Sequence, residues 1–197
     1  MKPILLISAT LFFSIISFAQ GQKKEHLSFK GVPIDGKLSQ FILKMKQNGF
    51  VYIQTTNGMA LLNGDFAGYK NCYVSVSTLK ASDLVYKVTV VFKGRETWST
   101  LLGNYVSLKE LLSEKYGNPI DVLEKFDLNP YMEPKTDKDK LLQVKAGNCM
   151  YFSIWETDKG NVELSIERDD SKRCFVRLRY FDKINGEVVR ANAKDDL

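Results

Sequence analysis

The chain has 197 residues, a formal net charge of only +5 at pH 7 and three cysteines. Basic and acidic side chains alternate along its whole length, so no basic block is present to grip phosphate backbones, and we expect no nucleic-acid partner. The wide spacing of the cysteines excludes a local metal knuckle. The length is sufficient for one domain with a sizeable core.

Residues 1–19 have the features of a cleavable secretory signal. Lys2 supplies a positive charge, a short apolar stretch follows, and Ser17 and Ala19 place small residues at the cleavage site. The apolar stretch is shorter than the about 20 residues that span a bilayer. We therefore expect cleavage before Gln20, a periplasmic or secreted protein, and no membrane span in the mature chain.

The first half of the mature chain predicts a short strand at 27–34, a helix and four strands. Asp35 is the expected N-cap of the helix, and Asn48 with Gly49 is its expected end. Apolar residues at helical spacing predict its buried face: Leu38, Phe41, Ile42 and Met45. The four strands are expected over 50–54, 59–66, 71–79 and 84–92. In the last of them, alternation predicts one shared face for Leu84, Tyr86, Val88, Val90 and Phe92.

A second helix is expected over 97–116, and Gly117 with Pro119 ends it. Ser107 and Glu110 have capping-box spacing, which suggests that the helix restarts after them. Beyond the helix, the sequence predicts in turn a strand at 120–126, an exposed loop at 127–140, strands at 149–155, 162–168 and 174–181, and a polar tail from Asn185 whose last residues are loose.

These elements predict an α+β fold in which helices pack on one face of an antiparallel sheet, with 20–197 as a single domain. Their order resembles the saddle of the TATA-box-binding protein and the β-lactamase-inhibitor-protein-like fold. Three motifs are also similar to uncharacterised exported proteins of Gram-negative envelopes: GVPIDG at 31–36, GDFAGY at 64–69 and KYGNP at 115–119. The resemblance implies a location and a fold with one sheet face free to bind, and it carries no catalytic residues.

No catalytic, metal or cofactor site is expected. The only histidine is His26, and we expect it on a frayed terminus, where a catalytic group cannot be held in place. Alternation places Cys72 and Cys174 toward the core and Cys149 on the outer face. The three cysteines are then free thiols, or Cys72 and Cys174 form one disulfide.

The outer face of the last three strands is the most informative surface. Aromatic and arginine side chains are enriched at protein interfaces, although ordinary cross-strand pairing also explains such a pattern. The candidate binding surface consists of Tyr151, Trp155, Phe175, Arg177, Arg179 and Phe181.

The sequence thus favours an exported, non-enzymatic binding or interaction domain whose partner is a protein or an envelope component. Two alternatives stay open. One is a small periplasmic hydrolase or transferase that works without histidine, and the other is a self-associating structural protein of the envelope.

Overall fold

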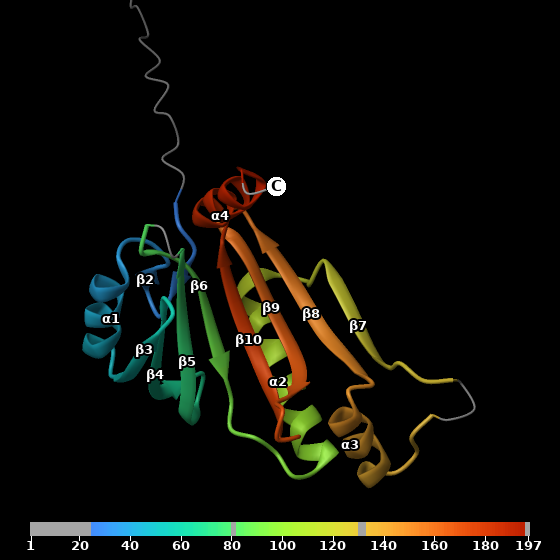
Figure 1. The fold of residues 1–197 in the computed structure, drawn as a ribbon. Coiled ribbons are helices and arrows are strands. Elements are labelled where there is room, and N and C mark those ends of the chain that lie inside the picture. Colours follow the sequence, from blue (N-terminus) through green and yellow to red (C-terminus); the bar gives the residue numbers. More distant parts are fainter. Residues whose placement is uncertain (1–24, 80–81, 130–132, 196–197) are drawn as a thin grey trace, which may run out of the picture.

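The computed structural model describes residues 25–79, 82–129 and 133–195, and the predicted signal at 1–19 lies outside them. Eight antiparallel strands form one sheet in the order β3-β4-β5-β6-β10-β9-β8-β7, and β1 and β2 form a small hairpin beside it (Figure 1). The predicted α+β class with an antiparallel sheet is confirmed. The strands are β1 (Ser28–Phe29), β2 (Val32–Pro33), β3 (Val51–Thr56), β4 (Met59–Phe66), β5 (Tyr69–Leu79), β6 (Leu84–Val91), β7 (Asp121–Phe126), β8 (Cys149–Thr157), β9 (Gly160–Arg168) and β10 (Cys174–Asp182).

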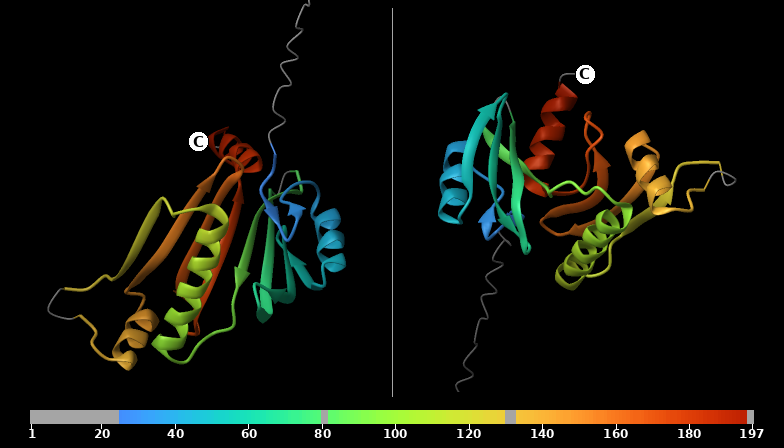
Figure 2. Two further views of the ribbon diagram at one scale, coloured as in Figure 1. Left: turned by 180° about the vertical axis from the view of Figure 1, so that it is seen from behind. Right: turned by 90° about the horizontal axis from the view of Figure 1, so that it is seen from below.

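Within the described residues, four helices flank the sheet: α1 (Leu38–Gln47), α2 (Trp98–Tyr116), α3 (Asp137–Ala146) and α4 (Lys183–Asp195). Figure 2 (right) shows the two halves of the sheet at an angle, with α1 and α2 on the outside of that angle and α4 inside it. We call the outer side the convex face and the inner side the concave face. Helices α1 and α2 thus pack on the convex face, as expected, and α4 lies on the concave side.

The apolar spacing correctly predicts the inner face of α1, because Leu38, Phe41 and Met45 are all buried. The predicted cap is wrong. Lys37 occupies the N-cap position without a side-chain hydrogen bond, and Asp35 instead accepts a hydrogen bond from the side chain of Asn185. Asp35 therefore does not cap α1, and it connects the segment before α1 to the C-terminal helix α4.

Helix α2 runs unbroken, so the predicted restart after Ser107 is wrong. Its cap is Thr97, whose hydroxyl accepts from the backbone N–H of Thr100, and Gly117 ends the helix with a φ of 83°. Glycine adopts this left-handed φ without the steric cost that a Cβ brings. The predicted end of α2 is thus confirmed.

The predicted loop at 127–140 is wrong from Asp137 onward, where α3 begins. Thr136 and Asp139 form a capping box, with the Thr136 hydroxyl accepting from the Asp139 N–H at 3.1 Å. The Asp137 carboxylate accepts from the first two backbone N–H groups of α2 at 3.0 and 2.7 Å. Negative charge there complements the helix dipole, so this acidic segment joins two helices.

From Asn185 the chain is a helix and not the predicted polar tail, because α4 continues directly from β10. The side chain of Asn185 is buried and donates to the carbonyls of Ile34 and Val85 at 3.1 and 2.9 Å. Its backbone N–H donates to the buried carboxylate of Asp182 at 2.8 Å. These bonds fix the first turn of α4 to the sheet and to the N-terminal segment.

Among the described residues, no helix is both long and apolar enough to cross a membrane.

A concave sheet face as candidate binding site

Strand register places the candidate side chains in rows across the concave face. Because neighbouring strands align residue by residue, side chains of one parity on β6, β10, β9 and β8 share that face. The rows are Lys87–Phe181–Asn161–Glu156, Thr89–Arg179–Glu163–Ile154 and Val91–Arg177–Ser165–Phe152.

A β-bulge adds Tyr86 to this face. The pairing of β5 with β6 shifts between Ser77 and Thr78, so Lys87 pairs with Ser77, Val85 pairs with Thr78, and Tyr86 has no partner. A bulge turns the extra side chain relative to plain alternation. The predicted shared face of Tyr86 with the core residues of β6 is therefore wrong, and Val85 is buried instead.

An ion-pair network spans the middle of the concave face. One carboxylate oxygen of Glu167 lies 2.6 Å from Arg177 Nη1, and the other pairs with Arg179 and accepts from the Ser165 hydroxyl at 2.7 Å. Arg179 Nη1 also lies 3.6 Å from the carboxylate of Glu163. Each of these charged side chains is about one quarter to one third exposed. The network is therefore accessible from solvent, and it fixes the arginines in place.

Lys87 lies beside this network without an ion pair among the described residues. Its ammonium lies 5.8 Å from the centre of the Phe181 ring and 5.6 Å from that of Tyr86. Burial lowers the pKa of Lys87, and the positive charges of Arg179 and Arg177 lower it further, while Glu163 acts in the opposite direction. Burial and the two neighbouring arginines thus disfavour the charged form of Lys87.

Glu163 is the acidic counterpart of Lys87 on this face. Burial raises the pKa of its carboxyl, and nearby Glu167 adds to the effect, whereas Arg179 and Lys87 oppose it. Both charged groups therefore sit where water stabilises them less than on an open surface.

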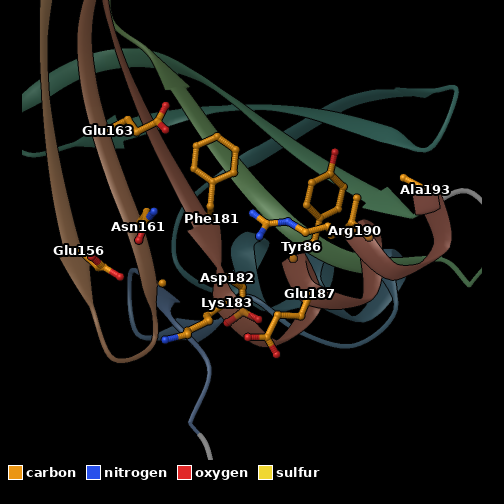
Figure 3. Close-up of a pocket in the computed structure, with 13 residues that line it drawn as sticks. Tyr86, Glu156, Asn161, Glu163, Phe181, Asp182, Lys183, Glu187, Arg190 and Ala193 are labelled. Carbon is orange, nitrogen blue, oxygen red and sulfur yellow. The ribbon is translucent and has the colours of Figure 1, made fainter. Parts of the chain in front are cut away.

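A hollow of about 580 Å³ lies between this face and α4. Figure 3 shows Glu163, Asn161 and Glu156 on one side, Tyr86, Arg190 and Ala193 on the other, and the Phe181 ring between them. The lining joins aromatic rings to charges of both signs. A hollow of this size accommodates one or two side chains of a partner.

A second hollow, of about 400 Å³, begins where the first ends and shares Glu163 with it. Its apolar wall consists of Met150, Phe152 and Ile154, and Arg179 forms part of its polar rim. Together the two hollows form a continuous depression along the concave face of β8, β9 and β10.

The rest of the concave face lies on β3, β4 and β5, whose described charged side chains are Asp65 and Lys70, paired with each other at 2.6 Å near the β4–β5 turn. Register aligns its side chains with the rows described above: Met59 with Ser77, Leu61 with Ser75, and Val51, Asn63 and Tyr73 together. Tyr73 and Met59 are about half exposed. One half of the face is thus neutral, and the other half carries the charges.

Four of the six predicted binding residues lie on the concave face. Arg177, Arg179 and Phe181 are partly accessible, whereas Phe175 is largely buried and lies 5.3 Å below the guanidinium of Arg177. These four were assigned to the correct side of the sheet, although Phe175 presents little surface to a partner.

Tyr151 and Trp155 were assigned to the wrong side, because both face α2. Trp155 is 1% exposed, and its ring N–H donates to the carbonyl of Gly117 at 3.0 Å. Tyr151 packs edge-on against Trp98 with ring centres 5.0 Å apart. Between them, Ser153 is also buried, and its hydroxyl shares a 2.7 Å hydrogen bond with Tyr105. Burial against α2 gives these two aromatic side chains a large apolar contact area, and each ring finds a polar or aromatic partner there.

The sequence reasoning missed the other parity of β8, which brings Met150, Phe152 and Ile154 to the concave face. Both alternating sets of side chains on β8 are apolar, so alternation alone does not show which set faces the helix. It also missed Tyr86, because nothing in the sequence reveals the β-bulge that brings this side chain to the concave face. The apolar spacing of Ile184, Val188 and Val189 is a helical signal that could have identified α4.

The histidine is held more firmly than predicted. His26 Nδ1 lies 3.1 Å from the buried Asp182 carboxylate, and Nε2 lies 3.4 Å from Asp35. The expected frayed position is therefore wrong. Because carboxylates face both ring nitrogens, this arrangement anchors the N-terminal segment and leaves neither nitrogen directed at a substrate.

All three cysteines are free thiols on the convex side of the sheet, so the predicted outward position of Cys149 is wrong. Burial raises the pKa of Cys149 to about 12 and raises those of Cys72 and Cys174 as well. A strand separates Cys174 from each of the other two, which places the Cα atoms about 9–10 Å apart or more. The proposed disulfide between Cys72 and Cys174 is excluded at this distance.

Within the described part of the chain, no three His, Cys, Asp or Glu side chains gather closely enough to hold a metal ion. A scan against protein-family models found no match, and searches of curated proteins and of solved structures found none either.

Proposed function

We propose that this chain is an exported, non-enzymatic domain that binds another protein through the concave face of its sheet. One observation carries the proposal: a concave face on which two adjoining hollows share Glu163, with aromatic and arginine side chains between them. The location rests on the signal features of residues 1–19.

The side chains of this face are those that give strong protein contacts. Phe181, Tyr86 and Phe152 offer rigid apolar area, and an immobilised ring costs little conformational entropy on binding. The arginines are already fixed by Glu167, so a partner does not bear the cost of ordering them. A preorganised surface of this kind favours binding without rearrangement of the sheet.

Charge indicates the chemistry of the partner. Three cations, Lys87, Arg177 and Arg179, face two carboxylates, Glu163 and Glu167, and Glu167 engages both arginines. An acidic side chain of a partner placed near Lys87 would give this lysine the ion pair that it lacks among the described residues. We therefore infer that the bound segment presents a carboxylate to Lys87 and apolar groups to the two hollows.

The thiols and the histidine do not supply a catalytic group, so a hydrolase or transferase would have to work through carboxylates or tyrosines. A thiol whose pKa is raised by burial is a poor nucleophile near neutral pH. His26 has a carboxylate against each ring nitrogen. A catalytic group needs a free position toward a substrate, and neither type of residue provides one.

The experiment is position-specific photo-crosslinking in the native cell envelope. A benzophenone amino acid replaces Ile154 or Tyr73 on the concave face, and Val106 or Leu111, which are exposed on α2, as matched convex controls. The proposal expects the same adduct from both concave positions and none from the controls. Equal adducts from both faces, or adducts from the controls alone, would contradict it.

A further inference from the structure

Helix α4 is attached to the rest of the protein by its first turn. The side-chain amide of Asn185 donates to two buried carbonyl groups, and its backbone N–H donates to the carboxylate of Asp182. None of residues 186–194 is buried, and among the described residues Glu187 and Arg190 make no side-chain hydrogen bond or ion pair. The later turns of α4 are thus held less firmly than the first turn.

These later turns lie over the hollow of about 580 Å³, which we call the first hollow. Val189 and Ala193 line it from the helix, and Tyr86 and Phe181 line it from the sheet (Figure 3). The neighbouring Val188 does not line it and is 39% exposed. Because burial of apolar surface is favourable, the apolar side chains of α4 would gain free energy by packing on an apolar group in this hollow.

A glycine directly follows the anchored turn. Gly186 is the fourth residue of α4, and a Cβ at this position would meet no atom within 4 Å. Packing therefore does not require a glycine here. Within a helix, glycine leaves the backbone more freedom than any other residue does. Hinges commonly lie at the ends of elements and at small residues, so Gly186 is placed where the fixed turn of α4 could join a moving part.

We propose that α4 from Gly186 onward is a lid that closes over the first hollow when an apolar side chain of the bound protein segment enters it. Val189 and Ala193 then pack on that side chain from the helix, while Tyr86 and Phe181 contact it from the sheet. The lid slows the release of the segment, because α4 must open before the side chain can leave. The choice of occupant rests on the proposed function, but the closing of α4 can be measured without any partner.

The test places an apolar ring in the hollow of the purified protein. Asn161 is exposed and lines the first hollow from β9, so Asn161→Phe fills part of it. Amide hydrogen exchange of residues 187–194, followed by NMR, should then slow at least about fivefold, because the closed helix buries apolar surface and opens less often. The control Gln54→Phe adds the same ring at an exposed position of β3, the far edge strand, and should leave this exchange unchanged. Cooperative urea transitions show that both variants fold.

A second pair of variants tests which side of α4 closes. In the Asn161→Phe protein, Val189→Asp should abolish the slower exchange, whereas Val188→Asp, one residue away, should preserve it. Unchanged exchange in Asn161→Phe would overturn the inference, because the hollow would then be filled without closure of the helix. Equal effects of the two aspartate variants would also overturn it, since a lid has one inner side. Crosslinking in the envelope tests the proposed function separately, so its failure is distinguishable from a failure of the lid.

Discussion

Replacement of Asn185 by alanine should destabilise the protein strongly, although the residue is a polar one near the C-terminus. Its side-chain amide donates to Val85 O at 2.9 Å, to Ile34 O at 3.1 Å and to Asp35 Oδ1 at 3.1 Å. Alanine leaves two carbonyl groups in a buried site without this donor. Each unsatisfied buried group costs about 1–3 kcal/mol, so we expect a loss of roughly 2–4 kcal/mol in the free energy of unfolding.

The matched control is Asn192→Ala in the same helix, where the side chain is exposed. It should change stability by less than about 0.5 kcal/mol. Urea unfolding followed by circular dichroism gives both values. Amide exchange supplies a second readout, because Asn185→Ala should speed exchange throughout α4. Equal losses for the two variants, or unchanged exchange in α4, would refute the argument that this amide anchors the helix.

Three further predictions follow from the observed faces and charges. Trp155→Ala should cost about 3–5 kcal/mol, as a buried ring does, and Met150→Ala on the concave side should cost clearly less; urea melts compare them. A maleimide reagent should label Cys149 before the other two cysteines because Cys149 alone of the three is partly exposed, although slowly at neutral pH because burial raises its pKa to about 12; peptide mass mapping gives the order. Although burial acts in the opposite direction, hydrogen bonds from Asn185 and Gly36 and the charge of His26 leave the pKa of Asp35 lowered. Its contribution to stability should be present above the unfolded pKa and lost as pH falls below about 4, so Asp35→Asn should flatten that part of the pH–stability profile.

The strands and the buried face of α1 could be predicted because their periodicity is strong and local. Leu38, Phe41 and Met45 repeat at helical spacing, and Asn57 with Gly58 marks the tight turn between β3 and β4 with φ values of 52° and 73°. Such signals depend only on near neighbours in the chain. For that reason they can be seen without the tertiary structure.

The errors share a different cause, since each depends on contacts between distant segments. Asp137 was assigned to a loop because its alternating charges suit solvent, but the N-terminus of α2 holds it. Asn185 was assigned to a tail because its buried carbonyl partners lie about a hundred or more residues away. Neither partner can be read from the local sequence.

The β10 part of the candidate site was predicted correctly and the β8 part was not, and this difference has a physical reason. On β10, Arg177 and Arg179 alternate with the buried residues Val176, Leu178 and Tyr180, so parity is clear and the assignment is correct. On β8, aromatic and aliphatic residues occupy both parities, and Tyr151 and Trp155 enter the core because α2 offers them partners. Sequence alone does not show which apolar set the helix covers.

Charge reversal at Lys87 tests the central claim, that the concave face binds a protein segment carrying a carboxylate. Crosslinking from position 154 is measured in Lys87→Glu and in Lys138→Glu, an exposed control on α3, with urea midpoints as a check on folding. We expect at least about a tenfold loss of adduct for Lys87→Glu, equivalent to about 1.4 kcal/mol of binding free energy, and no loss for Lys138→Glu. Equal adduct yields from both variants and the unaltered chain would contradict the account.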